Sequence, residues 1–110
     1  MTTLKNSVRL IGYLETEPEF EENDHKARFS LATVDTYTDE NGKVTKVYEW
    51  HNIVALGELS TYVEENLTRG SDITLEGRLT YHKYVDSKGN NRFITEIIAN
   101  DILVLEKNFF

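Results

Sequence analysis

Alternating apolar and polar residues, the pattern of a half-buried β-strand, dominate this chain. The first such segment is 8–14, in which Val8, Leu10 and Leu14 fall on one side and Gly12 interrupts the pattern. A glycine inside a strand often marks a bulge or a sharp bend that curls a sheet. The segment therefore predicts an opening strand that bends at Gly12.

Two further strands are predicted in the first half of the chain. Residues 27–35 alternate, with Phe29 and Leu31 inward and the polar residues between them outward. The dipeptide Asn41-Gly42 is a strong hairpin signal, because both residues tolerate a positive φ. It predicts that the second strand returns as a third strand over 44–56.

The spacing of apolar residues then changes to that of a helix. Leu59, Val63 and Leu67 recur at four-residue intervals, which predicts one short amphipathic helix over 57–67 that is ended by Gly70. Strand signals return after it, with strict alternation over 73–79, a polar hairpin tip at 86–91 and an isoleucine-rich segment over 93–105.

The predicted order is three strands, one helix and two strands, without a linker or internal repeat. This is the layout of the OB-fold, an all-β, five-stranded Greek-key barrel that binds oligonucleotides or oligosaccharides and here has its helix between strands three and four. A length of 110 residues fits one such domain. We expect residues 1–105 to form it and 106–110 to be a short C-terminal end.

Composition narrows the class of protein. Apolar residues make up 39% and charged residues 28%, which is ordinary for a globular protein, and no apolar run is long enough to span a membrane. The absence of cysteine excludes disulfides, thiolate nucleophiles and thiolate metal sites. A cytoplasmic location in a reducing cytosol fits best.

The net charge of −7 is unusual for a nucleic-acid-binding protein, whose contact surface is basic. However, residues 15–24 hold six acids and no base, whereas 78–92 hold four bases and one acid. Charges act strongly on a bound phosphate only within about one Debye length, roughly 10 Å at 0.1 M salt. A positive surface on an acidic molecule is therefore compatible with this sequence.

Signals for catalysis are weak. The three histidines show no metal-ligand spacing, and the chain has neither a glycine-rich phosphate loop nor a nucleophile elbow, so we expect no enzyme activity, no metal and no cofactor. One alternative is a metal-dependent nuclease that uses Asp35, Asp39 and Glu40. These acids flank the Asn41-Gly42 turn, where aspartate is common for local hydrogen bonding.

Aromatic residues are more informative. Trp50, the only tryptophan, lies in the middle of the predicted strand 44–56, and Ile53 falls on the opposite side of that strand, which favours an outward tryptophan. Val54 and Leu56 share the side of Trp50, so alternation alone leaves a core position open.

Three tyrosines accompany Trp50: Tyr48 on the same strand side, Tyr37 before the first hairpin and Tyr84 in the second. Sequence-independent binding of unpaired DNA needs aromatic rings for its bases and cations for its phosphates. We expect the cations to be Arg28, Lys43, Lys46, Arg78, Lys83, Lys88 and Arg92. Tyrosines in hairpins also occur as plain cross-strand packing, and that alternative stays open.

The chain resembles the bacterial single-stranded DNA-binding protein family from Asn6 to about Leu105. Five motifs carry this resemblance in the family's order and at compatible spacing: Asn6-x-Val8-x-Leu10-Ile11-Gly12-x-Leu14 with Pro18-Glu19, Ala27-Arg28-Phe29-Ser30-Leu31-Ala32-Thr33, Glu49-Trp50-His51-Asn52-Ile53-Val54, Leu67-x-Arg69-Gly70 leading to Glu76-Gly77-Arg78-Leu79, and Tyr84-x-Asp86-x-x-Gly89-x-x-Arg92-Phe93-x-Thr95-Glu96-Ile97.

The resemblance implies an OB-fold homotetramer that wraps single-stranded DNA and protects it in replication, recombination and repair, in the cytoplasm at the nucleoid. Trp50, Tyr37 and Tyr84 match the family's base-stacking positions. Lys83 and Arg92 match basic positions that contact phosphate, and His51 matches a residue near the subunit interface. Leu56 stands where relatives often have a phenylalanine, and leucine cannot stack on a base.

Family members usually continue into a flexible tail with an acidic tip that recruits repair and replication enzymes. This sequence ends at Phe110 without such a tail, so we do not expect that recruitment. A further alternative is a barrel module of a replication-restart or conjugation complex, in which protein contacts dominate over DNA binding.

Overall fold

The computed structural model describes residues 5–105, apart from the side chain of Glu22. The predicted C-terminal end at 106–110 therefore lies outside the described residues. The elements are β1 (Val8–Leu14), β2 (Glu19–Glu21), a 3₁₀ turn (Glu22–Asp24), β3 (Lys26–Thr38), β4 (Val44–Leu56), α1 (Glu58–Asn66), β5 (Asp72–Val85) and β6 (Asn91–Val104).

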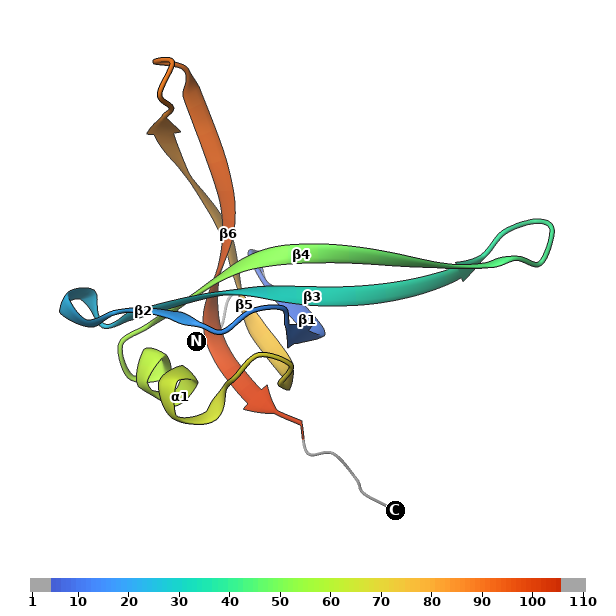
Figure 1. Cartoon of the computed structure of the whole chain (residues 1–110), viewed down its shortest axis with the longest axis horizontal. Helices are drawn as coiled ribbons and strands as arrows, with labels where there is room; N and C mark the ends of the chain where they lie inside the picture. The colour runs from blue at the N-terminus through green and yellow to red at the C-terminus, as the bar shows by residue number, and fades with distance from the viewer. Residues whose placement is uncertain (1–4, 106–110) are drawn as a thin grey trace.

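The strands form one sheet in the order β1-β5-β6-β4-β3-β2, and a further pairing of β1 with β3 closes it into a barrel. That closing contact consists of the pairs Tyr13–Ala32 and Leu14–Leu31. The long strands are antiparallel neighbours except β4 and β6, which pair in parallel through Ile53–Ile97 and Val54–Ile98. The five-stranded OB-fold barrel predicted from the sequence is confirmed (Figure 1).

The short strand β2 and the 3₁₀ turn after it were not predicted. The three exposed residues of β2 pair with the beginning of β3, where Glu21 lies opposite Lys26. A strand of three residues is too short to show an alternation, and two of its residues are glutamates. The acidic segment 15–24 is thereby held beside the start of β3, at the far end of this strand from the Asn41-Gly42 turn.

Gly12 allows two strands to approach closely, which differs in detail from the predicted bend. The pairing of β1 with β5 runs through Gly12 without a register shift. A Cβ atom at this position would lie 2.2 Å from the backbone oxygen of Ala32, which no real contact allows. The bulge occurs instead between Glu76 and Gly77, in the pairing of β5 with β6.

The core lies inside the barrel and beneath α1. Its largest fully buried side chains come from four strands and the helix: Leu14, Leu31, Ile53, Ile73, Leu75 and Val63. Leu67, just after the helix, is also buried, which confirms the predicted amphipathic helix and its apolar side. The Gly57 carbonyl accepts hydrogen bonds from the backbone N–H and the hydroxyl of Ser60, which fixes the first turn. Within residues 5–105, no helix has the length and apolar character needed to cross a bilayer.

Two hairpins extend from the barrel as separate two-stranded arms (Figure 1). The first arm is the outer part of β3 and β4, paired out to Thr38–Val44, and the second is the outer part of β5 and β6, paired out to Val85–Asn91. The arms point in different directions, so each presents two faces of exposed side chains beside the barrel.

Both arms end in the same kind of loop. In the first, the carboxylate of Asp39 accepts hydrogen bonds from the backbone N–H groups of Asn41 and Lys43, and Gly42 has φ 81°. The predicted Asn-Gly hairpin is confirmed. In the second arm, the carboxylate of Asp86 accepts hydrogen bonds from the backbone N–H groups of Lys88 and Asn90 in the same way, and Gly89 between them has φ 81°.

Candidate nucleic-acid interface

An aromatic strip runs along the outward side of β4. Trp50 is 59% exposed and Tyr48 is 45% exposed, and their rings stack with centroids 6.4 Å apart and planes 20° apart. The prediction that Trp50 faces outward is therefore confirmed. Val54, on the same side, is buried because β4 is flanked there by both β3 and β6.

A cation extends this strip toward the tip of the first arm. Lys46 lies on the same alternation of β4 as Tyr48 and is exposed, and no salt bridge is found for it among the described residues. The order along one face is thus cation, ring, ring. Flat bases and regularly spaced phosphates are the groups that such a surface accommodates.

Tyr37 belongs to the other face of the same arm. It is exposed and lies opposite Thr45, whereas Tyr48 lies opposite Val34. Directly paired residues share a face and successive residues alternate, so Tyr37 and Tyr48 project from opposite faces of the ribbon. The three rings singled out from the sequence, at positions 37, 50 and 84, therefore do not form one continuous platform.

The second arm also carries different groups on its two faces. Tyr84 lies opposite Arg92, on the face that includes Arg78 and His82. Lys83 lies opposite Phe93, on the other face. Tyr84, Lys83 and Arg78 are exposed, and the two faces together offer rings and cations in two directions.

Two of the predicted phosphate-binding cations are engaged within the chain. Arg28 bonds through Nη1 to Oε2 of Glu96 at 2.5 Å and through Nε to Glu21 at 3.4 Å. Burial lowers the pKa of Arg28, but the bonds and charges of Glu96 and Glu21 outweigh burial and raise it, so the guanidinium stays charged. Arg92 bonds through Nε to Oδ2 of Asp86 at 3.0 Å.

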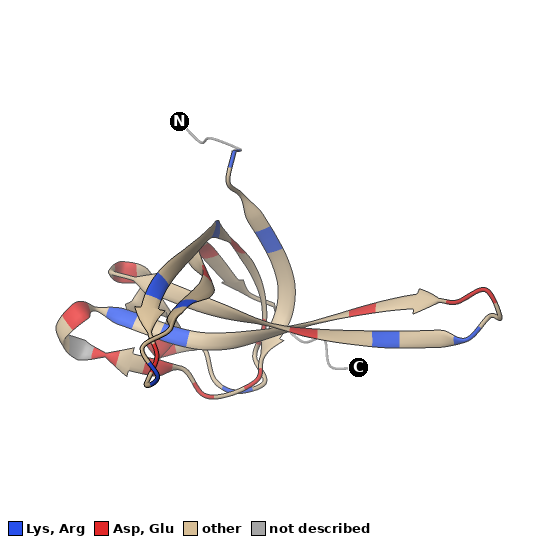
Figure 2. Cartoon of the chain, turned by 90° about the horizontal axis from the view of Figure 1, so that it is seen from above, with Lys and Arg blue, Asp and Glu red and all other residues tan. Residues whose placement is uncertain are grey.

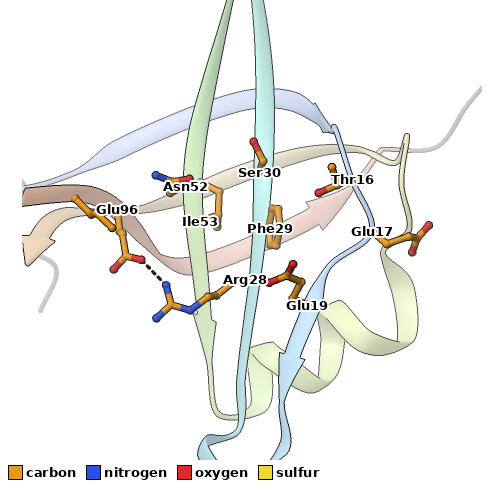
Figure 3. A pocket seen from close by; sticks show the side chains of 10 residues that line it. Thr16, Glu17, Glu19, Arg28, Phe29, Ser30, Asn52, Ile53 and Glu96 are labelled. Atoms are coloured by element: carbon orange, nitrogen blue, oxygen red, sulfur yellow. Dashed lines mark hydrogen bonds and ion pairs between the residues drawn. The ribbon is translucent and has the colours of Figure 1, made fainter. Parts of the chain in front are cut away.

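The surroundings of Arg28 form a small cavity of about 330 Å³ (Figure 3). Glu17, Glu19 and Glu96 line it together with the hydroxyls of Thr16 and Ser30. Glu96 is buried and also contacts His82, with 3.1 Å between Oε1 and Nδ1. With three carboxylates around one arginine, this part of the surface does not attract a phosphate.

The remaining predicted cations lie on the arms. Lys43 and Lys88 are exposed in the two arm loops, beyond the last strand pairs. No salt bridge is found for Lys43, Lys46, Arg78, Lys83 or Lys88 among residues 5–105. Bases and acids are mixed along the first arm, and acids gather around the segment that contains β2 (Figure 2).

A groove lies between the bases of the two arms. It has a volume of about 340 Å³, with Trp50 and Asn52 on one side and Leu79, Phe93 and Thr95 on the other. The side-chain amide of Asn52 donates to the backbone oxygen of Thr95 at 3.3 Å and links the arms. The sequence did not predict that Phe93 lines a groove, because Phe93 shares the strand side of the inward Ile97 and therefore resembles a core position.

His51 lies on the opposite side of β4 from Trp50. Its Nε2 is 3.0 Å from the hydroxyl of Thr33, and it is half-buried beside Arg9 and Ile11 of β1. Its assignment to a subunit interface stays a prediction.

The nuclease alternative would use the acids before the Asn41-Gly42 turn, and the structure shows where two of them lie. Asp39 organises the arm loop through its two backbone hydrogen bonds, and Asp35 lies on the face of the arm that carries Val47. Within the part of the chain that the structure describes, no three His, Asp or Glu side chains are grouped so as to hold a metal ion.

Asp86 offers a test of how charge limits binding. The backbone N–H of Asn90 and the guanidinium of Arg92 hold its pKa below the usual value, so the ion pair persists as the pH falls until that lowered pKa is reached. Asp86→Asn keeps the loop acceptor but releases Arg92. We expect tighter binding to oligothymidine and a salt dependence of log Kobs that is steeper by about 0.7, the value for one added phosphate contact.

Asp39→Asn is the matched control for this experiment, since it removes the same charge from the same loop geometry without releasing an arginine. Fluorescence anisotropy over a salt series measures both slopes. Equal slopes in the two variants would mean that Arg92 makes no phosphate contact.

Comparison with known proteins agrees with this geometry. The model of the single-strand binding protein family matches residues 5–105. Single-stranded DNA-binding protein 1 of Chlorobaculum tepidum is 36% identical over 91% of this chain, which spans 64% of that relative's length. Single-stranded DNA-binding protein 1 of Xylella fastidiosa is 36% identical over 93% of this chain and 78% of its own length.

Solved structures show the same fold. The Plasmodium falciparum SSB in complex with ssDNA superposes with a TM-score of 0.81 at 29% identity, covering 96% of this chain and 99% of that one. The small single-stranded DNA-binding protein of Streptomyces coelicolor gives 0.72 at 26% identity, covering 89% and 92%. The barrel is thus that of an OB-fold protein. The chain belongs to the single-strand binding protein family.

Proposed function

We propose that this protein binds single-stranded DNA without sequence preference and protects it during replication, recombination and repair. The observation that carries the proposal is the exposed Trp50–Tyr48 stack on the outer face of β4. An aromatic ring exposed to water contributes little to the stability of the fold, because its apolar surface is not buried. Here two such rings lie side by side, and Lys46 follows them on the same side of β4.

Aromatic stacking and phosphate contacts make separate contributions to the proposed binding. A base stacked on an aromatic side chain contributes about 1–3 kcal/mol whatever its identity, which gives affinity without sequence preference. Trp50 and Tyr48 act on the outer face of the first arm, and Tyr37 and Tyr84 stack further nucleotides on other faces. The phosphates are contacted by Lys43, Lys46, Arg78, Lys83 and Lys88, and by Arg92 when it leaves Asp86.

The faces of the arms favour a curved path for the DNA. A straight strand cannot reach both Trp50 and Tyr37, because these residues project from opposite faces of the first arm. A strand that passes around the arm reaches both. We therefore propose wrapping rather than linear binding, on a homotetramer in which His51 lies near a subunit contact. Such a protein acts where DNA is unwound, at the nucleoid in the cytoplasm.

The proposal is tested by titrating the full chain with oligothymidine while recording tryptophan fluorescence. Trp50 is the only tryptophan, so the signal reports one position. We expect quenching that saturates, and a weakening of binding as salt rises because condensed counterions are released from the DNA. Double-stranded DNA of equal length is the control. The proposal fails if oligothymidine at low salt causes neither quenching nor a mobility shift.

A further inference from the structure

We propose that the imidazole of His82, positioned by Glu96, contacts a DNA phosphate when it is protonated and thereby makes DNA binding depend on pH. This inference rests on the proposed function and adds to it one contact residue, one positioning residue and a dependence on protons. The sequence did not point to His82, because its three histidines were tested only as metal ligands or interface residues.

His82 lies on the side of the second arm that carries Tyr84. It is paired with Ile94, and Tyr84 is paired with Arg92, so these side chains share one face of the ribbon. Two residues along a strand span about 7 Å. The phosphate of a nucleotide that stacks on Tyr84 is therefore within reach of the His82 side chain, which is 50% exposed.

Glu96 holds one nitrogen of the His82 ring. Its Oε1 lies 3.1 Å from Nδ1 of His82, and its Oε2 bonds to Nη1 of Arg28. The side chain of Glu96 is only 9% exposed, and a buried carboxylate is stable as an anion when it is paired in this way. Because a carboxylate oxygen only accepts hydrogen bonds, the contact favours the ring form with its proton on Nδ1.

The other ring nitrogen, Nε2, then changes its role with pH. In the neutral ring it presents a lone pair, which repels a phosphate oxygen. When the ring gains a proton, Nε2 becomes a hydrogen-bond donor and the ring becomes a cation, and both changes favour a phosphate. Among the described residues no partner is found for Nε2 of His82, so this nitrogen is available to DNA.

The charged groups around His82 come from three strands. They are Arg78 of β5, Glu96 and Arg92 of β6, and Arg28 of β3, whereas the outward positions 50, 52 and 54 of β4 carry no charge. Arg28 offsets the charge of Glu96. The acids Glu17 and Glu19 line the cavity beside Arg28, and His82 does not line this cavity. A proton on His82 therefore adds a positive charge to a side that already carries Arg78.

The test measures affinity for oligothymidine between about pH 5.5 and about pH 8, a range in which histidine is the ordinary side chain that titrates. Thymine and the phosphodiester keep their charges over this range. We expect the wild type to bind about threefold more tightly at the lower pH, which is the size of one exposed charge pair. We also expect the salt dependence of log Kobs to be steeper there by about 0.7, the value for one phosphate contact.

His82→Gln is expected to lose this pH dependence and to bind as the wild type does at the higher pH. His25→Gln is the matched control, because it removes an exposed histidine just before β3 and away from the second arm. It reports how far the overall charge of the protein alone changes the affinity. We expect the control to keep the threefold change of the wild type.

Glu96→Gln tests the positioning role. An amide of the same shape can donate or accept, so it no longer fixes the proton on Nδ1 of His82. Nε2 then carries a proton in part of the neutral rings as well. We expect this variant to bind DNA with a smaller pH dependence than the wild type.

A further measurement uses the wild type alone. The ring nitrogens of His82 are observed by ¹H–¹⁵N NMR through a pH titration, with and without oligothymidine. We expect the proton of the neutral ring on Nδ1. We also expect DNA to raise the pH midpoint of the ring signals, because a ligand that prefers the protonated form increases proton affinity by the same factor.

The outcomes separate this inference from the proposed function. Equal affinity of the wild type across the pH range, or a full pH dependence in His82→Gln or Glu96→Gln, would overturn the inference and leave DNA binding intact. A pH dependence that disappears in His25→Gln would assign the effect to overall charge, which also overturns it. Absence of binding by the wild type at every pH would remove the proposed function itself.

Discussion

Replacing Tyr37, Trp50 and Tyr84 together by alanine is expected to weaken binding to oligothymidine by at least about two orders of magnitude. Each stacked ring contributes about 1–3 kcal/mol, and three rings at the lower bound already exceed a hundredfold change in Kd. All three side chains are exposed, so their removal leaves the core intact. Fluorescence anisotropy at constant salt measures the change.

The control for this triple variant is Val44→Ala, an exposed substitution on the same arm as Trp50 and Tyr37. Circular dichroism and thermal unfolding confirm that both variants are folded before affinities are compared. Should the triple variant hold the DNA as tightly as the wild type, base stacking on these rings is not the source of affinity.

The largest effect on stability is expected from Gly12→Ala. The added methyl group would meet the backbone oxygen of Ala32 at 2.2 Å, and a strand backbone in a closed barrel cannot shift by itself to relieve this. Overpacking of this kind costs about 1–3 kcal/mol, and a clash with backbone belongs at the upper end. We expect the midpoint of thermal unfolding to fall by at least about 12 °C.

Gly42→Ala serves as the comparison for Gly12→Ala. At Gly42 an added Cβ meets nothing within 4 Å, but φ is 81°, so only the strain of a left-handed conformation is introduced, about 1 kcal/mol. The difference between the two variants isolates the collision of β1 with β3. If Gly12→Ala unfolds at the same temperature as Gly42→Ala, β1 and β3 can move apart enough to accept the added methyl group at no cost in stability.

Features that depend on local periodicity could be predicted from the sequence. The five long strands and the helix follow from spacings of two and four. The same spacing favoured an outward Trp50 opposite the inward Ile53 but left a core position open, and the structure decides for the outward position. Both hairpins follow from short turn motifs. These signals are local because backbone geometry repeats within a few residues.

Features that depend on pairing between distant strands could not be predicted. Arg28 is withdrawn from the set of free cations by Glu96, which lies 68 residues away along the chain. The opposite faces of Tyr37 and Trp50 depend on the register of β3 with β4, which the sequence does not state. Trp50 and Phe93 line the same groove because β4 and β6 pair in parallel at the base of the arms.

The repeated aspartate–glycine loops make the length of each arm independent of the barrel. Each loop is stabilised by hydrogen bonds to an aspartate at its start. Residues can therefore be removed from the two strands of an arm while the loop at its end is kept unchanged. Trimming one residue from each strand would invert the faces of everything beyond the cut, whereas trimming two would restore them. Arm length is therefore adjustable in steps of about 7 Å. An engineer could alter the reach of the proposed DNA-binding surface without redesigning the interior of the barrel.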